Sequence, residues 1–419
     1  MARPRSVAVD ARLAAYRGGG IAEHTRRLLA GIAALPAVER EAWRVTVLAH
    51  RRAVDESGEV DGAGRTGVDP SDPSDPSDAV IAASAPGTLG DRADDVFRRR
   101  HLRTPPHHRF EAFTLPIDAA LAGCPPRGLL HCPDVAVPTL WLGPIVATVH
   151  DVAFLRHPER LTADSLRYYA RVHRTVRRAR RVIAVSDHTA RELTALTRID
   201  PRRIRVVPNA VDDRFRPADG PADADADRAA CARLGLTSPF VLFVSTIEPR
   251  KNVGVLLDAF AALARDRTDL TLALAGADGW HSEAITDHAR DLGLGDRLRF
   301  LGWVPDDDLV ALYRTAACLA HPAVDEGFGL TPVEAMACGT PTVVSAAGSL
   351  PEVTGDAALV VPPDDPAAWA EAIRRVLDDA TLARCMAGAG RARAEGFTLE
   401  RMARATLDVY REAVAGERR

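Results

Sequence analysis

HPAVDEGFGLTPVEAMACGTP, residues 321–341, places two glutamates eight positions apart between an apolar run and a helical pattern. The apolar run predicts a strand that ends at His321, and the helical pattern predicts a helix that begins near Leu330. Glu326 therefore falls in the connecting loop, and Glu334 falls one turn into the helix. Both carboxylates follow the carboxyl end of a strand, which is where α/β proteins bind ligands.

Two glycines in this loop, Gly327 and Gly329, leave backbone N–H groups without a covering side chain. Such N–H groups at the start of a helix bind anions, and they suit a diphosphate. A plainer interpretation stays open for each glutamate taken alone. One would be a solvated loop carboxylate, and the other a carboxylate stabilised by the dipole of its helix.

Short β-rich runs alternate with helical patterns along the whole chain, which indicates doubly wound α/β sheets. The predicted strands are 6–10, 44–49, 128–132, 145–150, 181–186 and 204–208, and then 240–245, 271–276, 298–302, 317–322, 341–345 and 358–362. A chain of 419 residues also exceeds what one hydrophobic core usually organises. We therefore expect two Rossmann-like domains whose sheets present their carboxyl ends to a common cleft.

Composition shifts mark the predicted domain boundaries. A Pro-, Gly-, Asp- and Ala-rich stretch separates the two series of strands and predicts a linker. The repeat DPSDPSDPSD has no apolar residue and predicts a partly disordered insertion. The predicted parts are an N-terminal domain 1–215 with the insertion 51–100, a linker 216–238, a C-terminal domain 239–397, and a final helix within 398–419 that packs back across the junction.

Charge and cysteine usage restrict the class of protein. The formal net charge of -3 argues against a nucleic-acid binder, which would carry a strong basic excess. The six cysteines include no CxxC pair, so they indicate free thiols in a reducing compartment. The first residues lack the apolar segment of a signal peptide, and no run of about 18 apolar residues could span a bilayer. We expect a cytoplasmic protein.

The stretch STIEPRKN, residues 245–252, contains the only lysine among 54 basic residues. A biased coding composition would convert lysine to arginine wherever any positive charge suffices. Lys251 then survives where arginine cannot replace it, because the two cations differ in shape at a tight phosphate site. The alternative explanation is that this one lysine was retained by chance.

The spacing of Glu326 and Glu334 around EGFGLTPVE resembles the donor-sugar motif of retaining glycosyltransferases of glycosyltransferase family 4, which have the GT-B fold. The resemblance covers nearly the whole chain except 51–100 and 215–238. It implies an α/β protein of the GT-B type, with two Rossmann-like domains facing across a cleft. It also implies that Glu326 contacts hydroxyls of the donor sugar and that Glu334 binds the ribose.

The same resemblance assigns further donor contacts to the start of the helix and to the lysine loop. Arg250 and Lys251 would neutralise the donor diphosphate, whose charge grows as the glycosidic bond breaks. Many family members have an arginine about five residues before the lysine, but this chain has Thr246 there. The remaining predicted donor-binding residues are Phe328, Gly329, Leu330 and Thr331.

The first half of the chain supplies the other predicted contacts. Gly19 and Gly20 follow the first strand in a loop that approaches the donor phosphate in family members. Their spacing is not GxGxxG, which disfavours a nicotinamide dehydrogenase, and a simple tight turn is the alternative. His150 is assigned to the donor sugar or leaving group and Asp151 to the acceptor, against the alternative of a polar pair that caps a strand. Asn209 is interpreted as mainly architectural.

Two further stretches allow other interpretations. The motif DADAD, residues 223–227, is similar to a metal-binding motif, but no predicted strand precedes it, so no metal site is expected. The predicted helix 165–181 carries seven arginines. A solvated helix face is one interpretation, and peripheral contact with anionic lipid at the inner face of the membrane is the other.

The predicted function is that of a retaining glycosyltransferase with a nucleotide-sugar donor and a glycan or lipid-linked acceptor, without a metal or other cofactor. TIEPRKN and HDVAFLRHP most resemble bacterial mannosyltransferases, which implies mannose from GDP-mannose. A nucleotide-sugar 2-epimerase of the same fold and a noncatalytic glycosyltransferase-like binding partner are the alternatives. The noncatalytic partner would be expected to lose Lys251 or Glu326, and both are present.

Overall fold

The computed structural model describes residues 5–15, 19–50, 96–106, 110–156, 166–167, 169–236, 239–279 and 282–415. These residues form two compact units. Unit 1 holds the described residues up to 210 together with 399–415, and unit 2 holds the described residues from 211 to 398. Most of the predicted insertion 51–100 lies outside the described residues.

Unit 1 is built on a seven-stranded sheet in the order β3-β2-β1-β4-β5-β6-β7, in which every pair is parallel. The strands are β1 (Arg5–Asp10), β2 (Trp43–His50), β3 (Arg98–Leu102), β4 (Leu129–Cys132), β5 (Ile145–Val149), β6 (Arg181–Ala184) and β7 (Ile204–Val206). The helices are α1 (Gly20–Ala34), α2 (Ala37–Arg40), α4 (Glu111–Leu121), α5 (Ala153–Arg156), α7 (Val172–Arg178), α8 (Asp187–Thr197) and α17 (Leu399–Ala415), with 3-10 turns η1 (Arg12–Ala15) and η3 (Pro201–Arg203). All five residues of β5 are buried, as expected for a parallel strand covered on both faces.

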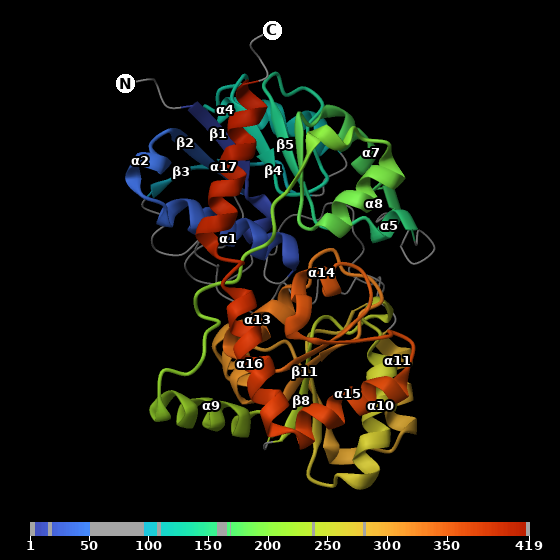
Figure 1. Ribbon diagram of the computed structural model, residues 1–419. Helices are drawn as coiled ribbons and strands as arrows, with labels where there is room; N and C mark the ends of the chain where they lie inside the picture. The colour runs from blue at the N-terminus through green and yellow to red at the C-terminus, as the bar shows by residue number, and fades with distance from the viewer. Residues whose placement is uncertain are drawn as a thin grey trace, which may run out of the picture. The chain divides into compact units, whose positions relative to one another are not determined.

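Residues Leu399–Ala415 form α17, which belongs to unit 1 (Figure 1). Its apolar stripe packs against α1, where a Cβ atom on Gly31 would lie 2.4 Å from the carbonyl oxygen of Leu399. Tyr410 is buried, stacks edge-on against Trp43, and its hydroxyl lies 2.7 Å from Nδ1 of His131. The last helix of the chain therefore completes the core of the first unit.

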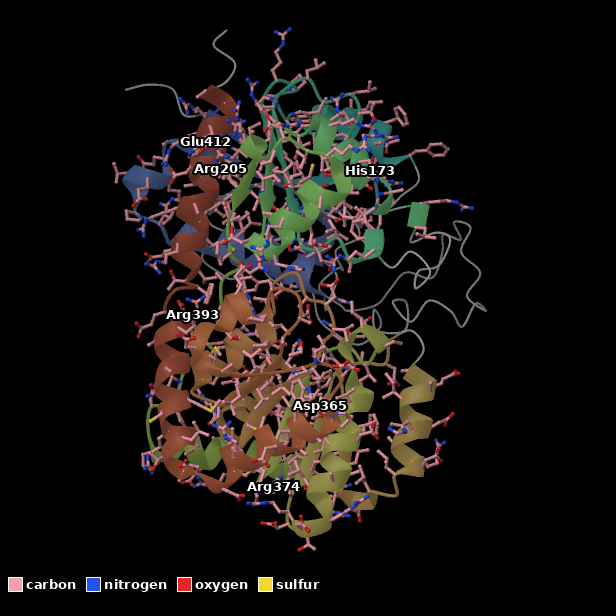
Figure 2. All side chains as sticks on the ribbon, turned by 45° about the vertical axis from the view of Figure 1, so that its right-hand side comes forward. His173, Arg205, Asp365, Arg374, Arg393 and Glu412 are labelled. Carbon is pink, nitrogen blue, oxygen red and sulfur yellow. The ribbon has the colours of Figure 1, made fainter. Side chains whose placement is uncertain are left out.

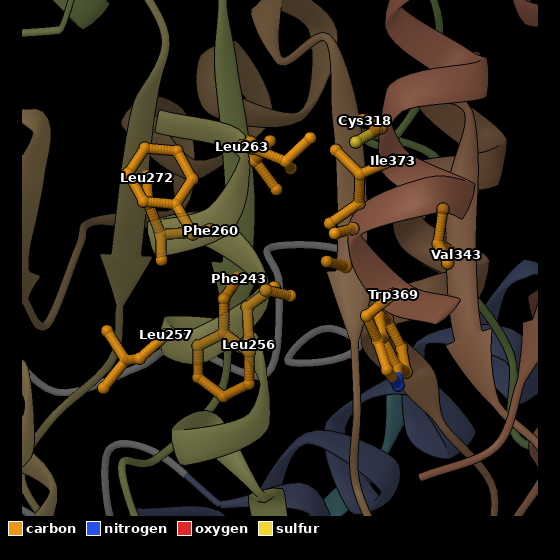
Figure 3. Packing of buried hydrophobic residues seen from close by; sticks show 14 of the residues in the cluster. Phe243, Leu256, Leu257, Phe260, Leu263, Leu272, Cys318, Val343, Trp369 and Ile373 are labelled. Carbon is orange, nitrogen blue, oxygen red and sulfur yellow. The ribbon is translucent and has the colours of Figure 1, made fainter. Parts of the chain in front are cut away.

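Unit 2 contains a six-stranded parallel sheet in the order β10-β9-β8-β11-β12-β13. The strands are β8 (Phe240–Val244), β9 (Thr271–Ala275), β10 (Leu298–Gly302), β11 (Cys318–His321), β12 (Thr342–Ser345) and β13 (Leu359–Val361). The helices are α9 (Pro221–Arg233), α10 (Val253–Asp266), α11 (Ser282–Asp291), α12 (Asp306–Thr315), α13 (Leu330–Cys338), α14 (Leu350–Thr354), α15 (Pro366–Asp378) and α16 (Ala380–Ala394), with 3-10 turns η4 (Pro249–Lys251), η5 (Gly295–Arg297) and η6 (Gly355–Ala357). Apolar residues of α10 and α15, including Phe260 and Trp369, cover one face of this sheet (Figure 3).

Both units are Rossmann-like, as predicted, and the structure differs from the sequence expectation in three elements. Residues 221–233 of the predicted linker form α9, because Pro221 starts a helix and the alanines that follow favour one. Strand β3 lies at the sheet edge, and its first three residues fall in the stretch 51–100 that was predicted to be an insertion. The arginine-rich helix ends at Arg178, so Arg180 and Arg181 lie beyond it.

Candidate functional site

The predicted donor residues of unit 2 lie in the loops that follow two neighbouring strands, β8 and β11. After β8 the chain forms η4 and then α10, with Asn252 in the left-handed region at φ 57°. After β11 it forms the glycine-bearing loop and then α13. A backbone hydrogen bond of 3.0 Å from Val324 N–H to the Arg250 carbonyl joins the two loops. Both predicted loops therefore lie at the carboxyl edge of the unit 2 sheet.

Lys251 and Glu326 meet at this edge. Nζ of Lys251 lies 2.5 Å from Oε1 of Glu326, and their side chains are only 10% and 12% exposed. Arg250 lies 3.7 Å from Oε2 of Glu326 and donates to Glu248 at 3.1 Å. Two cations therefore share two carboxylates in a half-buried cluster. Glu248 was not singled out from the sequence, where it is one of many carboxylates.

His321 holds Glu326 from the other side. Its Nε2 lies 3.0 Å from Oε1 of Glu326, and its Nδ1 lies 3.3 Å from the hydroxyl of Thr331. An ionised carboxylate only accepts hydrogen bonds, so a neutral His321 must donate from Nε2 and accept from Thr331 at Nδ1. Thr331 was predicted to bind the donor directly, and its side chain here orients the histidine. His321 itself was noted only as the end of a strand.

Burial and charge fix the protonation of this cluster. Burial lowers the pKa of His321, although Glu326 opposes that effect, so the ring is neutral near pH 7. Burial alone would raise the pKa of Glu326, but Lys251, the His321 hydrogen bond and Arg250 hold it well below its usual range. Glu326 is therefore a carboxylate, with Oε1 accepting from two donors.

Glycine geometry shapes the loop before α13. Gly329 caps the helix at φ 91° without a capping side chain. Gly348 at φ 60° lies so close that a Cβ atom there would be 2.6 Å from the backbone nitrogen of Glu326. Ser349 donates to the Glu326 carbonyl from both N–H, at 3.0 Å, and Oγ, at 2.9 Å. The backbone that carries Glu326 is therefore fixed from the facing loop, while the first N–H groups of α13, from Leu330 onward, lack a side-chain cap.

Glu334 does not share the partners of Glu326 and instead contacts Tyr313. It is buried, lies on α13 as predicted, and accepts a 3.1 Å hydrogen bond from the hydroxyl of Tyr313. Tyr313 in turn packs edge-on against Phe215. Phe328 is also buried, so only its backbone groups suit the predicted donor contact. The structure thus brings Glu326 together with Arg250 and Lys251, and it gives Glu334 a separate partner.

In unit 1, the predicted residues Gly19 and Gly20 begin α1, and Gly19 adopts φ 103°. His150 follows β5 and donates from Nε2 to the carbonyl of Pro133 at 2.9 Å. Asp151 accepts from the N–H of Ala153 at 3.3 Å, which is a capping contact for α5.

A second histidine next to His150 was not found from the sequence. His24, on the inner face of α1, stacks edge-on against His150 with ring centroids 4.7 Å apart. Its Nδ1 donates to Oδ1 of Asn209 at 2.7 Å, and its buried Nε2 has no hydrogen-bond partner. Burial and the neighbouring His150 lower the pKa of His24 well below its usual range, so this ring is neutral. Asparagine occurs only at positions 209 and 252 of the sequence, and this rarity was the one signal that pointed to Asn209.

Gly276 offers a direct test of the backbone next to the lysine loop. It follows the last residue of β9 and adopts φ 154°, and a Cβ atom there would lie 1.9 Å from the carbonyl oxygen of Ser245. We expect Gly276→Ala to destabilise the protein by about 3 kcal/mol or more, because overpacking and an unfavourable φ add together. Thermal or urea unfolding measures the loss. Gly254→Ala on α10 is the matched control, since its Cβ would meet nothing within 4 Å; equal stability of the two variants would contradict the geometry.

Neither a metal-binding cluster nor a membrane-spanning helix occurs among the described residues. Among them, His, Cys, Asp and Glu side chains do not gather in groups of three or more that could hold a metal ion. Across the same residues, no helix combines the length and apolar character that a bilayer crossing requires.

Comparison with known families matches both halves of the chain. The family model described as "Glycosyltransferase Family 4" matches residues 18–215, and the one described as "Glycosyl transferases group 1" matches residues 232–393. The second match contains the whole cluster around Lys251 and Glu326, and the first contains His24, His150 and Asn209.

Individual relatives agree with this assignment. D-inositol 3-phosphate glycosyltransferase from Salinispora tropica is 37% identical over 66% of this chain, which is 61% of the relative's length. O-antigen chain mannosyltransferase B from Escherichia coli is 32% identical over 68% of this chain and 74% of its own.

Solved structures show the same fold at lower identity. Sucrose-phosphate synthase from Thermosynechococcus elongatus superposes with a TM-score of 0.70 at 24% identity over 98% of this chain and all of its own. Anabaena HepE in complex with UDP-glucose does so with a TM-score of 0.69 at 18% identity over 97% and 99%. The two parallel sheets, the family matches and these neighbours give the GT-B fold. The chain belongs to glycosyltransferase family 4.

Proposed function

We propose that this protein is a retaining glycosyltransferase that transfers mannose from GDP-mannose to a hydroxyl group of a glycan or lipid-linked acceptor. The contact between Lys251 and Glu326 beside Arg250 carries the proposal, because it joins diphosphate-binding cations to a sugar-binding carboxylate. The E. coli relative named as an O-antigen chain mannosyltransferase supports mannose. The complexes of HepE with UDP and UDP-glucose support a nucleotide-sugar donor.

The cations act on the leaving group. A diphosphate gathers negative charge as the bond to the sugar breaks, and fixed positive charges in a half-buried site stabilise that charge more than they would in water. Lys251 and Arg250 supply this charge from the protein itself, so the proposed chemistry uses no metal and no other cofactor. The backbone N–H groups from Phe328 to Leu330 add dipoles of the same sign.

Glu326 acts on the sugar. Its Oε1 accepts from Lys251 and His321, whereas the contact from Arg250 to Oε2 is 3.7 Å, longer than a hydrogen bond. Oε2 therefore retains acceptor capacity, and we assign it to a hydroxyl of the donor sugar. His321 and Thr331 position the carboxylate.

Bond changes in the proposed reaction balance without a protein base. The bond from the anomeric carbon to the phosphate oxygen breaks, and a bond from the same carbon to the acceptor oxygen forms on the same face. The proton of the acceptor hydroxyl passes to the departing phosphate oxygen. His150, which donates from Nε2, presents Nδ1 as an acceptor for the donor sugar, and Asp151 orients the acceptor hydroxyl.

The remaining predicted donor contacts complete the proposal. Glu334 would accept hydrogen bonds from the ribose hydroxyls while it keeps its contact with Tyr313. The family resemblance assigns Gly19 and Gly20, at the start of α1, to the donor phosphate. We place the reaction in the cytoplasm, where nucleotide sugars are available.

Product analysis tests the proposed function. The purified protein is incubated with GDP-mannose, or with UDP-glucose as the competing donor, and with a panel of acceptors that includes inositol phosphate and lipid-linked sugars. NMR of the product then reports the anomeric configuration. We expect an α-linked mannose product. A β-linked product would contradict retention, and transfer from the UDP sugar alone would contradict the choice of donor.

The ribose contact of Glu334 predicts a binding defect. Glu334→Ala should weaken the affinity for GDP roughly tenfold or more, because hydrogen bonds to a charged group are lost, while kcat at saturating donor changes less. Calorimetric titration with GDP measures the affinity. Glu371→Ala, which removes a surface carboxylate in the same unit, is the control. Unchanged GDP affinity in Glu334→Ala would remove this residue from the nucleotide site.

A further inference from the structure

Three segments form one outer layer over a face of the unit 1 sheet. They are α4, the segment 133–144 and α7, and their buried sides contribute to a single apolar core. The N–H of Thr139 donates to the Ala112 carbonyl at 2.7 Å, and Arg178 donates to the Trp141 carbonyl at 3.2 Å. The segment 133–144 is thus tied to α4 on one side and to α7 on the other, so the three present one continuous surface.

This surface carries large apolar side chains that face outward. Positions 113, 117 and 121 of α4 repeat at helical spacing and lie on one stripe, opposite the buried Leu115 and Ala119. A helix that lies on the surface of a water-soluble domain normally turns polar residues outward. The exposed fractions are 49% for Phe113, 57% for Ile117, 83% for Leu121, 55% for Leu140 and 71% for Leu142.

Arginines gather beside Leu142 on this surface. A surface hollow of about 470 Å³ lies where the segment 133–144 meets the end of α7. Leu142 forms part of its wall, and five arginines line it: Arg177, Arg178, Arg180, Arg181 and Arg203. Glu412 pairs with Arg181 at 2.9 Å and with Arg205 at 2.8 Å; Figure 2 labels Glu412 and Arg205. Burial, and in part the nearby charge of Arg181, lowers the pKa of Arg203.

The three carboxylates of this layer are engaged by arginine side chains or by backbone N–H groups. Residues 110–144 and 169–181 together contain seven arginines and three acidic residues. Glu111 pairs with Arg12 and Arg171, and Asp118 accepts from the backbone N–H groups of residues 103 and 104. Asp134 is buried and accepts from its neighbour's N–H. The outer surface is therefore apolar and positively charged.

We propose that this surface docks the protein on a membrane that contains anionic lipids. Aromatic and aliphatic side chains beside arginines are the combination that binds at a bilayer interface, where the apolar groups enter the acyl boundary and the cations meet the lipid phosphates. A soluble polyanion would use the arginines but would leave the stripe of α4 in water. The inference goes beyond glycosyl transfer and does not rest on the choice of donor.

Vesicle flotation tests the docking surface without any donor sugar. The full chain is mixed with neutral phosphatidylcholine vesicles or with vesicles that also contain phosphatidylglycerol. We expect the wild type to float with the anionic vesicles only, and less so as salt is raised. Binding equally to both vesicle types, or to neither, would overturn the proposal.

Two pairs of substitutions separate the apolar and charged contributions. Ile117→Glu with Leu121→Glu should lower the partition coefficient on anionic vesicles roughly tenfold or more, because the stripe can no longer enter the interface. Arg177→Glu with Arg180→Glu should lower it by at least about 25-fold, at roughly fivefold for each positive charge lost.

Controls match each pair. Val38→Glu alters an apolar residue of α2 that is 81% exposed, and Arg375→Glu with Arg384→Glu alters exposed arginines of unit 2. These controls should float like the wild type, and all variants should unfold at the wild-type temperature. Wild-type flotation of both test pairs would overturn the proposal, and loss by the arginine pair alone would indicate a polyanion site in place of bilayer docking.

Discussion

Lys251→Ala should lower kcat roughly 100-fold or more, because the leaving diphosphate loses a fixed positive charge in a half-buried site. The ammonium group lies 2.5 Å from Oε1 of Glu326, and Lys251 ends η4 two residues before α10 begins. The same change should weaken binding of the nucleoside diphosphate. Initial rates at saturating donor, together with titration of free GDP, measure both effects.

Lys251→Arg shows whether charge alone is sufficient. The guanidinium group is broader than an ammonium group, and the Lys251 side chain is only 10% exposed. We therefore expect poor recovery of kcat. Arg374→Ala is the control, because Arg374 forms a similar pair with Glu371 at the surface of α15 (Figure 2). Turnover close to the wild type in Lys251→Ala would refute the assignment to the diphosphate.

Glu326→Gln should lower kcat by a similar factor, roughly 100-fold, but with the opposite effect on the nucleotide. The amide oxygen can take the place of Oε1 and accept from Lys251 and His321. The amide NH₂ then replaces Oε2 and cannot accept the hydroxyl of the donor sugar. GDP affinity should stay equal or increase, because the carboxylate that competes with the phosphates for Lys251 and Arg250 is gone.

The contrast between the two variants separates the two roles. Glu371→Gln, at a carboxylate that is 59% exposed, should match the wild type in both measurements. If Glu326→Gln lowered GDP affinity as strongly as Lys251→Ala, Glu326 would support the phosphate site and not the sugar. If it left kcat unchanged, the assignment of Oε2 to a sugar hydroxyl would be wrong.

Much of the architecture was predictable because it depends on local patterns. The strands of both sheets follow from short apolar runs, and the start of α13 follows from the glycines before Leu330. The family motif assigned Lys251 and Glu326 to the same donor site, but their direct contact was not predicted, because the two residues are 75 positions apart. Strand β3 escaped prediction because RRRHL is not apolar, and an edge strand needs little burial.

The positioning residues could not be predicted for a different reason. His321, Thr331 and Tyr313 act through hydrogen bonds whose partners lie on other turns or other elements, and their residue types are common at strand ends and in helices. His24 and Asn209 are 185 residues apart and meet only when α1 packs beside the segment after β7. No local pattern encodes such a contact, because it depends on the packing of the whole unit.

Calorimetric titration of GDP, UDP and ADP into the wild type, Lys251→Ala and Glu326→Gln is the most direct test of the donor site. We predict that the wild type binds GDP saturably, that Lys251→Ala loses this binding, and that Glu326→Gln retains it. Equal binding of GDP by the wild type and Lys251→Ala would contradict the account, because the lysine would then not hold the diphosphate.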